Sequence, residues 1–165
     1  MPHHYSWSFG WEEMVQEVAK AYQSVPVADR GDTAVFANDF AAAGAIDLIG
    51  PKYGLPKAIG GHQSYWLWGP RQFSGQTMII LGRTLDAAHG WFNDVTVVAD
   101  LHNPYAAPWE NGPVLLCRQP NGSIRSLKRG RNSRIGIEVR YLLRQRIHKY
   151  YERLHTKPLI ILQTC

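Results

Sequence analysis

The sequence predicts an α/β domain, a single layered fold in which a mostly parallel sheet is flanked by helices. Short apolar runs rich in strand-forming residues, such as "TAVFA" and "TMIIL", alternate with segments whose apolar residues recur every three or four positions. Strands that alternate with helices are typical of this class. The chain has 165 residues, of which 45% are hydrophobic, and this is enough for one domain with a sizeable core.

The first three elements are predicted to be a helix, a strand and a second helix. Between residues 10 and 24 the apolar positions follow helical spacing, and two acids lie in the first turn, where the helix dipole favours them. "TAVFA" (33–37) predicts a buried strand. Asn38-Asp39 follows it as the expected cap of a helix over "FAAAGAIDLIG" (40–50).

Four further strands and one helix are predicted after residue 50. "KAIGG" (57–61) predicts a short strand, and "QTMIILG" (76–82) is the clearest buried strand. Thr84 is the expected N-cap of a helix over "LDAAHGWF" (85–92). "DVTVVAD" (94–100) and "PVLLCR" (113–118) predict the last two strands, which are able to pair antiparallel at an edge of the sheet.

The charge of the chain divides it near residue 120. Residues 1–120 hold 7 Lys and Arg against 11 Asp and Glu, whereas residues 121–165 hold 11 against 2. We therefore expect an α/β domain over 1–120 and a basic extension over 121–165 that contains an amphipathic helix. Three interpretations of the extension stay open: contact with nucleic acid or an anionic membrane surface by charge alone, a solvated tail, or a segment that is not native coding sequence. No specific nucleic-acid partner is predicted.

Several classes of protein are disfavoured by missing patterns. No run of about 20 apolar residues is present, so the chain as written is not expected to span a membrane. The first residues lack the basic and apolar regions of a secretory signal. The phosphate-binding motifs GxGxxG and GxxxxGK[ST] and the nucleophile motif GxSxG are absent. Cys117 and Cys165 form no metal-binding pair, and we expect a buried thiol and a tail thiol.

No catalytic residue, cofactor or metal is predicted. Asp100 and His102, together with His62 or His89, are residue types that bind zinc, but their spacing matches no known metal site. Asp100 and His102 are expected to serve as loop and cap residues instead.

Candidate binding residues follow the predicted strands, because ligands of open α/β sheets bind beyond the carboxyl ends of the strands. Asn38 follows the strand over 33–37, and the loop "GGHQSYWLWGP" (60–70) follows the short strand before it. Aromatic planes beside polar donors stack on sugar rings or lipid headgroups, while tryptophans also serve as packing anchors for irregular loops, and both interpretations of the two loop tryptophans stay open. The candidate substrate-binding residues are Asn38, His62, Ser64, Tyr65, Trp66 and Trp68.

Four segments of the chain form a recognisable pattern: "FGWEEMVQEVAKAY", "AVFANDFAAAGAIDLIGPKYGLPKAIGGHQSYWLWGP", "TMIILG" and "NPYAAPWENGPVLLCR". Together they resemble the soluble C-terminal region of bacterial membrane glycosyltransferases in the dolichyl-phosphate-mannose protein mannosyltransferase superfamily, the aminoarabinose-transferase-like group. The resemblance covers roughly residues 5–119 and is most specific over 36–70, where the order from Asn38 to Pro70 matches the family's pattern. The segment after Gln119 departs from that pattern.

The resemblance implies an extracytoplasmic domain of a transferase that takes its sugar from a polyprenyl-phosphate donor at the bacterial membrane. In that family a multi-helix membrane domain is catalytic, so this chain alone is not expected to catalyse transfer. The implied partners are that membrane domain and a glycan or lipid-linked acceptor, with membrane-surface contact through the basic extension. The alternative hypothesis is a free-standing α/β module that binds a glycan or a nucleotide.

Overall fold

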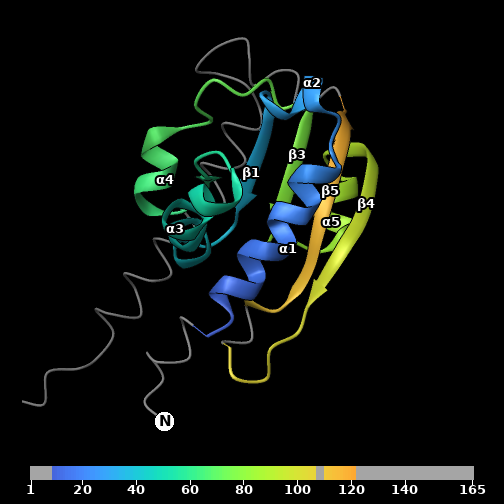
Figure 1. Cartoon of the computed structure of the whole chain (residues 1–165). Helices are drawn as coiled ribbons and strands as arrows, with labels where there is room; N and C mark the ends of the chain where they lie inside the picture. Colours follow the sequence, from blue (N-terminus) through green and yellow to red (C-terminus); the bar gives the residue numbers. More distant parts are fainter. Residues whose placement is uncertain (1–8, 107–109, 122–165) are drawn as a thin grey trace, which may run out of the picture.

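The computed structural model describes residues 9–106 and 110–121 of the chain. Its strands form one open sheet with the order β2-β1-β3-β5-β4 (Figure 1). The strands are β1 (Thr33–Ala37), β2 (Ile59–Gly60), β3 (Thr77–Leu81), β4 (Phe92–Leu101) and β5 (Gly112–Pro120). The helices are α1 (Trp11–Ser24), α2 (Val27–Arg30), α3 (Phe40–Ile49), α4 (Gln63–Trp68) and α5 (Leu85–His89), with a 3₁₀ turn, η2 (Gly50–Tyr53), after α3.

The sheet is mixed, so the prediction of an α/β fold is confirmed while the prediction of a mostly parallel sheet holds for only part of it. β1 pairs in parallel with β2 and β3, whereas β5 pairs antiparallel with both β3 and β4. The last two strands pair antiparallel, which the sequence analysis left open, but only β4 lies at the edge of the sheet, because β5 lies between β3 and β4. The link from β4 to β5 is short, and antiparallel strands can be joined directly, whereas a parallel pair needs a crossover of a dozen or more residues.

One face of the sheet is covered by α1 and α3. Figure 1 shows α1 lying across β3 and β5, with α3 beside β1. Val15 and Val18 of α1 and Ile46 of α3 are fully buried against the sheet. The strand residues in this core alternate along each strand, as a pleated strand requires, and they are Val35, Ala37, Ile79, Leu81, Val114 and Leu116.

The opposite face carries a smaller core under α5. Ala88 of α5 packs with Phe92, Ile80, Leu115 and Cys117, all of them buried. Burial, and secondly the charge of Asp94, raise the pKa of the Cys117 thiol to about 12, so the group stays protonated at neutral pH. The expected buried thiol at position 117 is therefore confirmed, while Cys165 and the rest of the basic extension lie outside the described residues.

Two capping predictions are confirmed by hydrogen bonds. The Asp39 carboxylate accepts from the Ala41 amide at the start of α3, at 2.7 Å, and the Thr84 hydroxyl accepts from the Ala87 amide at the start of α5, at 3.3 Å. The helix predicted over 85–92 is shorter than expected. It ends at His89 because Gly90 follows, and β4 already begins at Phe92.

The interpretation of residues 60–70 as an irregular loop was wrong, because its centre is the helix α4. Glycines flank this helix on both sides, and the residues between them contain neither Gly nor Pro, so the helix is free to form. Trp66 and Trp68 are exposed, at 39% and 56%, so they do not act as packing anchors to the core. A helix of six residues turns only a narrow face inward, and Tyr65 occupies that face.

Candidate functional site

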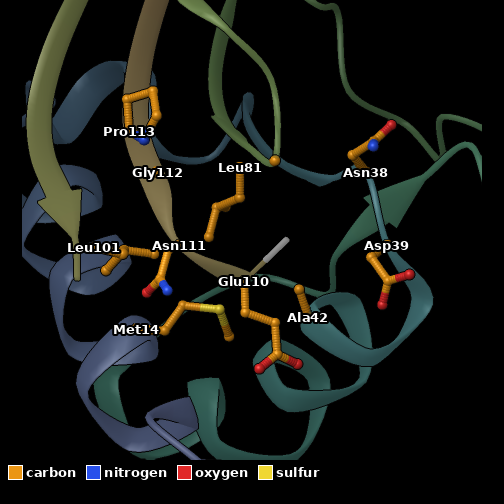
Figure 2. Close-up of a pocket in the computed structure, with 11 residues that line it drawn as sticks. Met14, Asn38, Asp39, Ala42, Leu81, Leu101, Glu110, Asn111, Gly112 and Pro113 are labelled. Atoms are coloured by element: carbon orange, nitrogen blue, oxygen red, sulfur yellow. The ribbon is translucent and has the colours of Figure 1, made fainter. Parts of the chain in front are cut away.

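The carboxyl ends of four strands meet at one edge of the sheet and surround a small hollow. β1, β2, β3 and β4 all end there and β5 begins there, and we call this the carboxyl edge. Figure 2 shows Asn38 and Asp39 on one side of the hollow, with Leu101, Asn111 and Pro113 opposite them. The lining residues are Met14, Asn38, Asp39, Ala42, Leu81, Gly82, Leu101, Glu110, Asn111, Gly112 and Pro113.

Two glycines let the strand ends approach this closely. Gly82 has φ of +71°, and a Cβ added there would lie 3.0 Å from the Cβ of Asn38. The Asn38 amide donates to the Leu81 carbonyl at 3.1 Å, which holds the end of β1 beside the end of β3. A Cβ added at Gly60 would lie 2.9 Å from the Ala37 carbonyl oxygen. Side chains at these two positions would push the strand ends apart.

Asp39 links the start of α3 to His62. One carboxylate oxygen caps α3, and the other lies 3.7 Å from Nδ1 of His62, whose side chain is 42% exposed. This Nδ1 atom is itself buried and makes no hydrogen bond within the described residues. The imidazole also contacts the Phe40 ring, with the centroids 5.3 Å apart. His62 is therefore held at the carboxyl edge, next to the hollow's Asp39 wall.

The opposite wall comes from the link between β4 and β5. The Asn111 side chain accepts from the Asn103 amide at 2.7 Å and donates to the Asn103 carbonyl at 3.2 Å, so it ties the two ends of this link together. Trp11 at the start of α1 donates from its indole to Glu110 at 3.4 Å. The wall therefore carries the Glu110 carboxylate and the Asn111 amide, which also bond to Trp11 and to the Asn103 backbone.

The hollow is small, and its lining is mostly apolar, with Asn38, Asp39, Glu110 and Asn111 as its polar residues. Its enclosed space of about 20 Å³ holds about one water molecule. A larger ligand would therefore lie across its rim, where the side chains of Asn38, Asp39, Glu110 and Asn111 offer amide donors and carboxylate acceptors. Directed hydrogen bonds of this kind suit the hydroxyl groups of a neutral molecule, whereas two carboxylates repel an anionic one.

The structure places the predicted site residues in three groups. Asn38 lines the hollow, and His62 adjoins it through Asp39. Tyr65 is directed into the structure instead, where its hydroxyl donates to the Asp47 carboxylate at 3.1 Å. The remaining three, Ser64, Trp66 and Trp68, are exposed on α4 and do not line the hollow.

Sequence reasoning did not single out three residues of the site. Asp39 was predicted as a helix cap at a strand end where a ligand is expected, and Glu110 and Asn111 belong to the loop "HNPYAAPWEN" (102–111), which was considered only as a whole as a second contact to the acceptor. A signal for the last two exists in the segment "ENG" (110–112), where a polar pair directly precedes the glycine that opens a strand. No local pattern relates that segment to Asn38, because the hollow that both of them line depends on the order of the strands.

Replacing Asp39 with alanine is expected to lower the free energy of unfolding by about 1 kcal/mol, because the Ala41 amide loses its acceptor at the start of α3. The matched variant Asp39→Asn retains an oxygen acceptor and should stay close to the original chain. Urea unfolding of the two variants measures the difference. Equal losses in both would show that the charge facing His62 stabilises the fold and that the cap does not.

Within residues 9–106 and 110–121, no helix has the length and apolar character needed to cross a bilayer. The same residues contain no group of three His, Cys, Asp or Glu side chains placed to hold a metal ion.

Comparisons of the chain with protein-family models, with curated proteins and with solved structures found no match.

Proposed function

We propose that residues 9–121 form an extracytoplasmic domain of a polyprenyl-phosphate-sugar-dependent membrane glycosyltransferase, and that the carboxyl edge contacts the acceptor. The observation that carries the proposal is the placement of Asn38 and His62. Both belong to the segment with the most specific family resemblance, and both lie at the carboxyl edge, where open α/β sheets bind ligands.

The chemistry of the edge favours a sugar hydroxyl as the group it contacts. Asn38 and Asn111 supply donors and acceptors from opposite walls, and the carboxylates of Asp39 and Glu110 supply acceptors only. This set suits a neutral glycan. It disfavours a phosphate, which would meet two negative charges without a basic side chain lining the hollow.

The domain holds and places its ligand, and the chemical step belongs to the membrane domain of the parent enzyme. No residue of the carboxyl edge is assigned a catalytic role. The purified chain is therefore expected to bind a glycan without transferring sugar from a polyprenyl-phosphate donor. Turnover by the purified chain would overturn this division of roles.

A free-standing glycan-binding module is the second candidate, since the described part of the chain contributes residues to both walls of the hollow. The DNA sequence upstream of the gene segment distinguishes the transferase domain from the free-standing module. Encoded apolar segments in frame favour the transferase domain, and a ribosome-binding site with no such segments favours the module.

The glycan proposal is tested by calorimetric titration of the full chain with neutral oligosaccharides, glycosyl phosphates and nucleotides. We expect saturable binding of a neutral oligosaccharide, and Asn38→Ala should weaken it about tenfold, because one good hydrogen bond to the ligand is lost. Asn93→Ala is the matched control, because Asn93 is exposed near the start of β4, at the opposite end of that strand. Equal weakening by both variants, or tighter binding of nucleotides than of glycans, would contradict the proposal.

A further inference from the structure

An exposed apolar surface lies on α4. It consists of the consecutive residues Trp66, Leu67 and Trp68, which are 39%, 72% and 56% exposed, and we call it the α4 patch. Leu48 near the end of α3 is also exposed, at 75%. Figure 1 shows α4 at the side of the molecule that lies furthest from β4. Large apolar side chains that gather on one surface mark a site of interaction.

Contacts between α4 and its neighbours fix the orientation of the helix and keep the α4 patch exposed. The Asp47 carboxylate accepts from the Ala58 amide at 2.7 Å and from the Tyr65 hydroxyl at 3.1 Å. These bonds tie α4 to α3 and to the segment before β2. The Tyr65 ring packs edge-on against Trp68, with the centroids 4.9 Å apart. Because Tyr65 takes the inward position, the three residues after it stay exposed.

Basic side chains flank the patch, although residues 1–120 carry more acids than bases. The guanidinium of Arg71 lies 5.7 Å from the centre of the Trp68 ring, and its Nε donates to the Ala58 carbonyl at 3.2 Å. Lys57 donates to the Asp47 carbonyl at 3.1 Å. The Asp47 carboxylate beside them accepts two hydrogen bonds and keeps its negative charge. The two cations outnumber this one anion, so the charge of these three groups favours an anionic surface.

The composition of the α4 patch favours a lipid surface over a sugar as its binding partner. Indoles are enriched where protein meets the interface of a bilayer, and flanking Lys and Arg bind anionic headgroups. The exposed Leu67 side chain contributes only apolar area and offers no hydrogen bond to a hydroxyl group. The patch also lies apart from the hollow, whose lining contains none of its residues.

We propose that the α4 patch inserts into the interface of an anionic bilayer, with Leu67 and Trp68 entering the acyl boundary and with Lys57 and Arg71 at the headgroups. The inference goes beyond the glycan site and does not depend on it. A chain could bind vesicles through this patch and no glycan, or a glycan and no vesicles, and the two sets of measurements separate these outcomes.

The test uses the full chain with an environment-sensitive fluorophore on a single introduced thiol. Leu67→Cys and Val27→Cys are compared, each with Cys165→Ser, while the buried Cys117 stays unlabelled. Val27 is the matched control, since it is an aliphatic residue of α2 that is 77% exposed and does not belong to the patch. With vesicles of phosphatidylcholine and phosphatidylglycerol in equal parts, we expect a blue shift and a several-fold rise in emission at position 67 and no change at position 27.

Sedimentation of unlabelled variants with the same vesicles gives a second measurement. At raised salt, where attraction by charge alone is screened, we expect Leu67→Glu to weaken vesicle binding about tenfold and Val27→Glu to leave it unchanged. Equal responses of the two labels, or equal binding of the two glutamate variants, would overturn the proposal. A response at position 67 that grows with protein concentration in the absence of vesicles would also overturn it, because the occupant would then be a second copy of the chain.

Discussion

Asp47→Ala is expected to detach α4 from α3 and to lower the free energy of unfolding by about 3 kcal/mol, because a charged acceptor of two hydrogen bonds is removed. The Ala58 amide is left without its partner in a buried residue, which adds the cost of an unsatisfied donor. Urea unfolding measures the loss, and hydrogen exchange at the Ala58 amide should quicken. Tyr65→Phe removes only the hydroxyl bond and should cost less than half as much.

A pH dependence follows from the same contact. Burial, and secondly the negative charge of Asp47, raise the pKa of Tyr65 from 10.0 to about 12. Because the pKa is higher in the folded chain, this contribution to stability is complete below pH 10 and is lost as the pH rises toward 12. Tyr65→Phe should lose less stability across that window than the original chain. An equal loss in both would contradict the assigned role of Asp47 and Tyr65.

Leu115→Ala is expected to lower the free energy of unfolding by about 3–5 kcal/mol, since it leaves a cavity in the core under α5. Leu115 is fully buried on β5, and β5 pairs antiparallel with both β3 and β4, so the loss falls inside the antiparallel part of the sheet. Chemical denaturation gives the value.

The matched control for this core variant is Leu67→Ala, the same side-chain deletion on the exposed α4 patch. It should change the free energy of unfolding by less than about 0.5 kcal/mol, because Leu67 is 72% exposed. A loss at position 67 as large as that at position 115 would mean that the α4 patch is buried in the folded chain.

Much of the fold is predictable because its signals are local. The apolar runs over 33–37 and 76–82 are too short for helices and are bounded by turn residues, and each forms a strand. The caps at Asp39 and Thr84 are read from the residue type before a helical segment. The position of β5 between β3 and β4 is different, since it depends on long-range pairing that neither periodicity nor capping encodes.

The helix α4 escaped prediction because it offers fewer than two turns in which a helical period can be recognised. Clustered aromatics between glycines are typical of a loop. The helix is held by the hydrogen bond between Tyr65 and Asp47, a tertiary contact that the local sequence does not reveal.

The candidate site likewise contains some residues that local signals predict and others that only long-range contacts place. Asn38 and His62 were found because ligands bind beyond strand ends, a rule that needs only the strands themselves. Glu110 reaches the hollow through the β4–β5 link, and its hydrogen bond with Trp11 joins residues 99 positions apart. No local pattern predicts such a contact.

The central claim is that the carboxyl edge binds a glycan, and an amide-resolved NMR titration with a neutral oligosaccharide tests it most directly. We expect saturable shifts at the backbone amides of Asn38, Gly82 and Asn111, which surround the hollow. Indole signals of Trp66 and Trp68 should stay unchanged in the same spectra. Shifts confined to those two indoles, or no shifts from a folded sample, would contradict the claim.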